Sequence, residues 1–259
     1  MNSAAVIVAT VGKQSLARTI GSVLGQTHQD VTCVVVVDGS RFTEPADAVL
    51  ETFRDNPRVQ IYYLPQNTGA NGFVCHRIYG ALPLLLNQDY IFYLDDDNWY
   101  DSEHVGQCVS ACQANHLDWC FALRKIYLED ETFLCNDECE SVGYWPTWYN
   151  SQVHHIDTNC YCLRRETAVQ LASMWHKSRL VDGEVQKSAD TGICEHLIRS
   201  GLRSALVPVA SVNYTLGSWA LSPSPDFFLK GNCVFRDSCG GILPWQRAKT
   251  EGVGPHRPE

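Results

Sequence analysis

Long apolar runs and a surplus of basic residues are missing from this 259-residue sequence. No run reaches the about 20 residues that a membrane-spanning helix requires, and the N-terminus has no basic segment followed by a cleavable apolar one. We therefore expect a cytoplasmic protein. The formal net charge is −9, which argues against nucleic acid as a partner, because binding to a phosphate backbone needs a basic surface.

Three common sequence signatures are missing too. The first predicted strand is not followed by G-x-G-x-x-G, and G-x-x-x-x-G-K-[ST] does not occur, which excludes a Rossmann dehydrogenase and a P-loop enzyme. The twelve cysteines include no C-x-x-C pair, which argues against a structural zinc site. Most of them lie in apolar segments, where a reduced cysteine packs as a small hydrophobic residue. The role of Cys135 and Cys139, in an acidic loop, stays open.

What the first half does contain is a regular alternation of strands and helices. Apolar runs predict strands over residues 4–10, 31–37, 59–64 and 90–94. Helical spacing predicts helices over residues 16–24, 45–53, 74–85 and 102–114. Elements in this order favour an α/β fold with a mostly parallel central sheet and helices on both faces.

The second half is less regular. We expect strands over residues 119–123, 125–129, 154–162 and 205–209, helices over 164–175 and 191–200, and a polar loop over 183–189. The tail that follows is punctuated by proline and glycine and has no periodicity. We therefore predict no regular element there.

Three adjacent carboxylates, Asp95, Asp96 and Asp97, follow the predicted strand over residues 90–94. Adjacent acids repel one another, and a hard divalent cation bound through oxygen relieves that repulsion. In open α/β sheets, ligands also collect beyond the carboxyl ends of the strands. A metal site is therefore our first hypothesis, and a helix-capping cluster is the simpler alternative.

With these features in order, the chain resembles glycosyltransferase family 2, which has the GT-A fold and uses nucleotide-sugar donors. The resemblance rests on short segments at residues 6–10, 22–27, 35–40, 67–69 and 93–98 and, more weakly, on Asp190. It implies that residues 1–100 form the nucleotide-sugar-binding half and residues 101–215 the irregular acceptor-binding and catalytic half. Residues 216–259 would be a tail or lid.

The resemblance implies a nucleotide site built from several of these segments. Thr10 and Asp38 would hold the base, Asp95 and Asp96 would contact the nucleotide, with Asp96 at the ribose, and Arg77 would face the ribose or the phosphates. An aspartate accepts a hydrogen bond from N3–H of uracil or thymine, a proton that cytosine lacks. A UDP- or dTDP-sugar is therefore the expected donor.

The resemblance also implies the chemical roles. Asp97 would bind Mn²⁺ or Mg²⁺, and Asp190 would be the catalytic base of an inverting sugar transfer. The family usually has an acidic pair at the base position, whereas this chain has Ala189 before Asp190. Without the family order, a helix N-cap is the favoured interpretation of Asp190.

The acceptor is expected to be a glycan, such as a bacterial-type surface polysaccharide, which would allow peripheral membrane association. Trp145, Trp148 and Tyr149 would stack on its sugar rings, or else close the core. His155 would assist at the site, or else be structural. The alternatives are a sugar-nucleotide pyrophosphorylase, whose glycine-rich loop with arginine is missing after the first strand, and a non-catalytic glycan-binding or scaffold relative.

Overall fold

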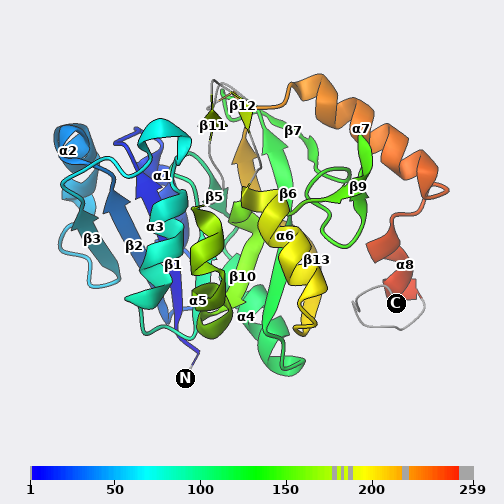
Figure 1. The fold of residues 1–259 in the computed structure, drawn as a ribbon, viewed down its shortest axis with the longest axis horizontal. Helices are drawn as coiled ribbons and strands as arrows, with labels where there is room; N and C mark the ends of the chain where they lie inside the picture. The colour runs from blue at the N-terminus through cyan, green and yellow to red at the C-terminus, as the bar shows by residue number, and fades with distance from the viewer. Residues whose placement is uncertain (1, 177–179, 182–183, 186–188, 218–221, 251–259) are drawn as a thin grey trace.

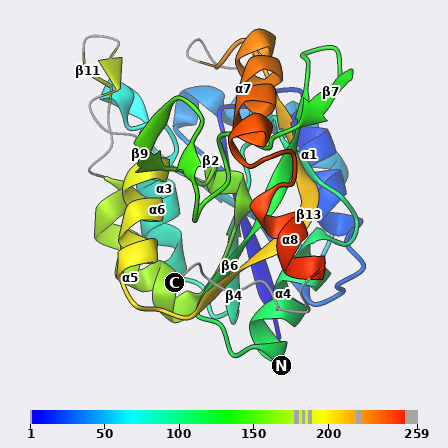
Figure 2. The ribbon, with the colours of Figure 1, turned by 90° about the vertical axis from the view of Figure 1, so that its right-hand side faces the viewer.

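A computed structural model describes residues 2–176, 180–181, 184–185, 189–217 and 222–250. Its central feature is a nine-stranded sheet with helices on both faces (Figures 1 and 2). The helices are α1 (Leu16–Leu24), α2 (Thr43–Leu50), α3 (His76–Ala81), α4 (His104–Ala114), α5 (Arg165–Trp175), α6 (Ala189–Arg199), α7 (Pro225–Ser238) and α8 (Pro244–Thr250). Figure 2 shows α3, α5 and α6 on one side of the sheet and α1 and α4 on the other.

The strands of the sheet follow the order β3-β2-β1-β4-β10-β6-β13-β5, and β7 pairs with the end of β6. They are β1 (Ala4–Thr10), β2 (Val31–Val37), β3 (Val59–Tyr63), β4 (Tyr90–Tyr93), β5 (Trp99–Tyr100), β6 (Trp119–Tyr127), β7 (Phe133–Asn136), β10 (Tyr161–Arg164) and β13 (Ser204–Thr215). Two small hairpins consist of β8 (Pro146–Thr147) with β9 (Asn150–His154) and β11 (Leu180–Val181) with β12 (Glu184–Val185). Single 3-10 turns lie at Ser40–Phe42, Glu51–Phe53, Ala70–Gly72, Leu82–Leu84 and Thr158–Cys160.

The first four strands confirm the α/β prediction. β1 pairs in parallel with β2 and β4, and β2 pairs in parallel with β3. The side chains of β2 and β4 are almost all buried, which is why both strands read as nearly continuous apolar runs. β10 then enters antiparallel between β4 and β6, so the sheet is mixed beyond β4.

Several predicted boundaries in the second half were wrong. Residues 119–127 form one strand where two were expected, over 119–123 and 125–129, because Arg124 stays in the strand and is buried against acidic partners. The predicted strand over residues 154–162 is interrupted by the turn at Thr158–Cys160, where the Asp157 side chain accepts from Asn159 N. β13 continues beyond residue 209 to Thr215, since register shifts accommodate Pro208.

Two helical predictions also need correction. The helix expected over residues 74–85 begins only at His76, because Val74 has a φ of 50°, and it gives way to a 3-10 turn at Pro83. The tail is helical: Ser224 accepts a hydrogen bond from Phe227 N, and Pro225 occupies the first turn of α7. Of the predicted loop over residues 183–189, only β12 and the first residue of α6 lie within the described residues.

The remaining general expectations concern cysteine and the membrane. All twelve cysteines are free, including Cys135 and Cys139, whose role the sequence leaves open. In the part of the chain that the structure describes, no helix has both the length and the apolar character needed to cross a bilayer.

Candidate functional site

A cavity of about 510 Å³ opens beyond the carboxyl ends of β1, β2 and β4. Six predicted site residues line it: Thr10, Asp38, Asp95, Asp96, Asp97 and Asp190. The first five are neighbours because parallel strands end at the same edge of a sheet. Asp190 reaches the same cavity from α6, on the other half of the chain.

Thr10 and Asp96 form one unit at this edge. The Thr10 hydroxyl donates to Asp96 Oδ2 at 2.7 Å and accepts from Gly12 N at 2.9 Å. The Asp96 side chain is only 7% exposed, and burial raises the pKa of its carboxyl although the Lys13 ammonium opposes that shift. The carboxylate is therefore held in one orientation facing the end of β1.

Asp38 holds the loop that follows β3. Its Oδ1 accepts from Thr68 N at 2.7 Å and from the Thr68 hydroxyl at 2.8 Å, and its Oδ2 accepts from Gly69 N at 2.8 Å. A Cβ on Gly69 would lie 2.3 Å from Val74 O, so only glycine fits this turn. Asp38 Oδ1 therefore accepts two hydrogen bonds already, whereas Oδ2 accepts one and can accept another from a ligand.

Asp95 is directed into the protein. Its Oδ1 accepts from the Tyr79 hydroxyl at 2.8 Å and its Oδ2 from Asn159 Nδ2 at 2.9 Å. Burial, together with the nearby Asp97 and Asp157 carboxylates, raises the pKa of Asp95 to about 7. The contacts tie the end of β4 to the turn before β10.

Asp97 faces a lysine that the sequence analysis did not single out. Lys13 Nζ lies 2.6 Å from Asp97 Oδ2 and 3.1 Å from Asp96 Oδ1. Burial acts to lower the Lys13 pKa, but the two carboxylates raise it above its ordinary value. Among the described residues, Lys13 is the only partner that contacts the Asp97 carboxylate, so this acid is the one of the three left for an external ligand.

Asp190 lies in the first turn of α6. Its Oδ1 accepts from the hydroxyl of Thr158, which also lines the cavity. Burial raises the pKa of Asp190, and His155 opposes that rise. Since Ala189 is already helical, Asp190 is not at the N-cap position that the simpler interpretation requires.

A buried cluster around Arg124 supports this wall of the cavity. The guanidinium is 2% exposed and forms ion pairs with Asp137 at 2.8 Å, with Asp157 at 2.5 Å and with Glu140. Asp157 Oδ1 in turn accepts from Asn159 Nδ2 at 2.7 Å. Because Asn159 also donates to Asp95, the cluster is linked to the acidic triplet. No local pattern in the sequence predicts the Arg124 cluster.

The other predicted site residues do not line the cavity. Arg77 lies over the Phe73 ring, 3.5 Å from its centroid, and donates to Thr68 O at 3.3 Å. His155 lies behind Asp190, with its Nδ1 3.4 Å from the Thr191 hydroxyl, and burial lowers its pKa.

The three predicted acceptor-binding aromatic residues pack against the tail helices. Trp145 contacts Trp245 of α8, with ring centroids 5.4 Å apart. Trp148 and Tyr149 contact Phe227 of α7 at 5.3 and 5.6 Å. Tyr149 still has 48% of its surface exposed, so it is the member of this group best placed to meet a ligand.

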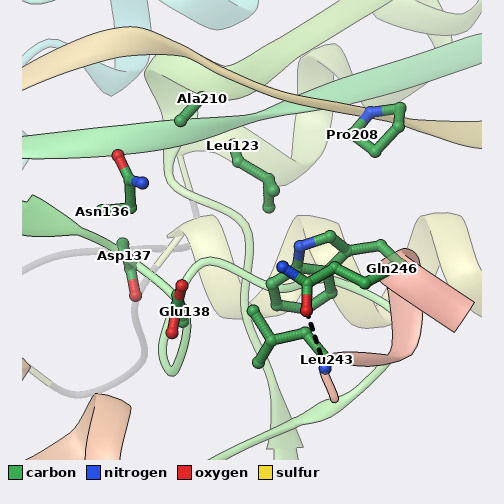
Figure 3. A pocket seen from close by; sticks show the side chains of 9 residues that line it. Leu123, Asn136, Asp137, Glu138, Pro208, Ala210, Leu243 and Gln246 are labelled. Carbon is green, nitrogen blue, oxygen red and sulfur yellow. Dashed lines mark hydrogen bonds between the residues drawn. The ribbon is translucent and has the colours of Figure 1, made fainter. Parts of the chain in front are cut away.

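A second cavity, of about 190 Å³, lies between β6, β13 and α8 (Figure 3). Its acidic groups already have partners: Asp137 pairs with Arg124 and Glu138 pairs with Arg236. Gln246 accepts from Leu243 N at 3.2 Å, as the dashed line in Figure 3 shows. Of these contacts, the Glu138–Arg236 ion pair joins the tail helix α7 to the segment after β7.

Comparison with known proteins adds a family and a set of similar folds. The profile of glycosyl transferase family 2 matches residues 5–162, which is more than half of the chain. No curated protein sequence matches.

Among solved structures, the chain is similar to fragment 1–349 of S. aureus TarS. In complex with UDP-GlcNAc that fragment has 16% identity and a TM-score of 0.59, over 93% of this chain and 67% of TarS 1–349. In complex with UDP the fragment has 14% identity and a TM-score of 0.59, over 91% of this chain and 64% of the fragment. Another structure of the fragment has 15% identity and a TM-score of 0.58, over 82% of this chain and 60% of the fragment. The chain thus spans between 60% and 67% of the length of TarS 1–349. The structural similarity establishes a shared fold of the GT-A type, and at identities this low it establishes the fold alone.

Proposed function

The chain belongs to glycosyl transferase family 2, and from this premise we propose that it transfers a sugar from a UDP- or dTDP-sugar to a hydroxyl group of a glycan, with inversion at the anomeric carbon. The observation that carries the proposal is that the acids predicted from separate segments, Asp38, the acidic triplet and Asp190, line one cavity. A nucleotide site and a base in one cavity are what such a reaction needs.

The donor proposal rests on Asp38. Its Oδ2 would accept from N3–H of uracil or thymine, while N3 of cytosine is itself an acceptor and would face the carboxylate without a proton between them. The similar fragment of S. aureus TarS has been crystallised with UDP and with UDP-GlcNAc, which supports a uridine nucleotide. The sugar itself is not specified by these contacts.

We propose that Asp97 binds Mg²⁺ or Mn²⁺ together with the donor. The residues fit such an ion: Mg²⁺ sites commonly use one or two carboxylates plus substrate phosphates, and among the described residues Asp97 is the acid of the triplet whose carboxylate has no neutral hydrogen-bond partner. When bound, the cation would neutralise charge on the departing diphosphate. Lys13, on the same carboxylate, would supply a second positive charge once it is displaced toward the phosphates.

Asp190 would accept the proton of the acceptor hydroxyl. As the acceptor oxygen bonds to the anomeric carbon, the bond from that carbon to the diphosphate oxygen breaks, and the nucleoside diphosphate departs with the bonding electrons. The raised pKa of Asp190 makes it a better base than an ordinary exposed aspartate. Thr158 holds its carboxylate in the cavity wall.

The acceptor would approach over Tyr149. This ring is the exposed part of the aromatic group between β8 and α7, and aromatic faces pack against the apolar faces of sugars. The family match favours transfer over the pyrophosphorylase alternative. A scaffold without activity would have little reason to bury several adjacent carboxylates at an energetic cost.

Calorimetry with UDP, dTDP, GDP and CDP, each with and without Mn²⁺, tests the proposal. We expect binding of UDP or dTDP that strengthens with Mn²⁺, and much weaker binding of CDP. If no nucleotide binds, only the scaffold alternative survives. Release of the nucleoside diphosphate from a panel of sugar nucleotides, measured with and without glycan acceptors, would then identify the sugar.

A further inference from the structure

Three cysteine side chains from three different elements meet on one face of the sheet. Cys112 projects from α4, Cys120 from β6 and Cys162 from β10. Cys120 and Cys162 are direct neighbours across the antiparallel pair, so their side chains lie on the same face, beneath α4. All three are fully buried, and none lines the donor cavity.

The sulfur atoms are close enough to share one ion. Cys112 Sγ lies 3.5 Å from Cys120 Sγ and 4.0 Å from Cys162 Sγ, and all three sulfur atoms lie within 4.8 Å of one another. With a Zn–S bond of about 2.3 Å, two sulfurs on one tetrahedral ion are about 3.8 Å apart. A disulfide would require about 2.0 Å. The observed spacing is thus closer to that of metal ligands.

The surroundings of Cys112 differ from those of an ordinary buried cysteine. Cys33 in β2 is equally buried, and burial raises its pKa to about 12. Cys112 is buried to the same extent, but its sulfur contacts the sulfurs of two other cysteines, Cys120 and Cys162.

We propose that Cys112, Cys120 and Cys162 bind one thiophilic d¹⁰ cation, Zn²⁺ or Cu⁺. Soft thiolate ligands select these ions, and a ligand set of sulfur atoms does not suit Mg²⁺ or Mn²⁺, which prefer oxygen. On binding, the thiols release their protons to solvent, and Arg164 offsets part of the remaining negative charge. The site is separate from the proposed donor-linked cation at Asp97.

The two ions differ in what they need. Structural Zn²⁺ sites almost always have four ligands, so Zn²⁺ would need one more than the three clustered sulfurs, and Cys108, one turn before Cys112 on α4 but outside that cluster, would have to move to supply it. Cys120 already contacts this residue, with its Sγ 3.6 Å from Cys108 O. Cu⁺ is satisfied by three sulfurs. Either ion would fasten α4 to β6 and β10, and would contribute to stability rather than to sugar transfer.

Metal analysis of the purified full chain tests the proposal. The protein is prepared without chelators, and its zinc and copper contents are measured by mass spectrometry for the wild type, Cys112→Ala and the control Cys33→Ala. We expect one ion per chain in the wild type and in Cys33→Ala, and loss of the ion in Cys112→Ala. Cys108→Ala distinguishes the two ions, because it should weaken the binding of Zn²⁺ and leave the binding of Cu⁺ unchanged.

A second readout does not depend on the metal acquired during expression. Addition of Zn²⁺, or of Cu⁺ under anaerobic conditions, to metal-free protein should raise the Tm of the wild type and of Cys33→Ala but not of Cys112→Ala. Co²⁺ should give thiolate-to-cobalt charge-transfer absorption in the same two proteins. If Cys112→Ala does not fold, the same measurements are made on Cys162→Ala, which should also lose the ion, and the cobalt absorption of the wild type shows whether sulfur binds the metal.

Two results would overturn the proposal. One is a wild-type protein that contains no zinc or copper and whose Tm does not respond to either ion. The other is a Cys112–Cys120 disulfide, detected by peptide mapping in protein purified without oxidant. Neither result bears on sugar transfer, since the nucleotide-binding experiment is independent of these cysteines.

Discussion

At the scale of single residues, Asp190 is the group on which the proposed chemistry depends. In Asp190→Asn the side chain can still accept the Thr158 hydrogen bond, but it cannot take a proton. We expect a folded protein with nearly unchanged donor affinity and a kcat lowered by about 10²- to 10⁴-fold. Steady-state kinetics and calorimetry with the nucleotide measure the two quantities. Equal loss of binding and turnover would instead point to a structural role.

The proton affinity of Asp190 gives a second prediction. Because its pKa is raised, its carboxylate becomes protonated, and thus inactive as a base, at a higher pH than an ordinary aspartate with a pKa of about 3.9. The value of kcat/KM should therefore decline on acidification through this raised pKa. Thr158→Val removes a hydrogen bond that stabilises the charged form, so the acid limb should move to still higher pH. An unmoved limb would exclude Asp190 as the titrating base.

Lys13 competes with a cation for Asp97, which gives a third prediction. In Lys13→Met the Asp97 carboxylate loses its ammonium partner, so Mn²⁺ should bind the nucleotide-free protein a few-fold more tightly, since a partly exposed ion pair contributes about 1 kcal/mol. Mn²⁺ binding can be followed by electron paramagnetic resonance. Lys125→Met, which breaks a similar pair with Asp101, is the control. Unchanged Mn²⁺ affinity in Lys13→Met would place the metal elsewhere.

At the scale of elements, α7 is attached to the sheet half through aromatic residues. Phe228 is fully buried, whereas its neighbour Leu229 is 44% exposed. Phe228→Ala should lower the free energy of unfolding by about 3 to 5 kcal/mol, and Leu229→Ala should change it far less. Urea unfolding of both variants measures the difference. Similar small losses in both would mean that α7 is not part of the cooperative unit.

Two of the strand boundaries that local patterns missed, at Arg124 and near Pro208, share one cause. Local patterns divide residues 119–129 at Arg124 and end the last strand at residue 209, just after Pro208, since a charged residue and a proline are both unfavourable inside an isolated strand. In the folded chain, Arg124 has three carboxylate partners, and Pro208 lies where the register of β13 shifts. The strands continue because tertiary contacts neutralise the charge of Arg124 and the shifted strand pairing accommodates Pro208.

At the scale of the whole molecule, the Arg124 cluster joins segments that are distant in sequence. Arg124→Met would leave the carboxylates of Asp137, Glu140 and Asp157 buried together without the cation that now pairs with them. We expect a loss of about 3 to 5 kcal/mol in unfolding free energy. The loss should be smaller at mildly acidic pH, where protonation removes the repulsion. Urea unfolding at two pH values measures this, and Arg54→Met at the surface is the control.

The sequence by itself determined the parallel half of the sheet and the grouping of its acids. The apolar, β-branched-rich runs of β1 and β2 predict their own bounds, and the carboxyl ends of parallel strands meet at one edge. Strand order and this shared edge are therefore enough to bring Thr10, Asp38 and the acidic triplet together.

Only the tertiary structure decided which side chains from segments distant in sequence meet. Lys13 reaches Asp97, Arg124 collects its three acids, and the sulfurs of Cys112, Cys120 and Cys162 converge, all without a spacing signature in the sequence. Periodicity reports which face of one element is buried, because that depends on near neighbours along the chain. Partners from distant segments depend on strand register and helix packing, and these are properties of the folded chain alone.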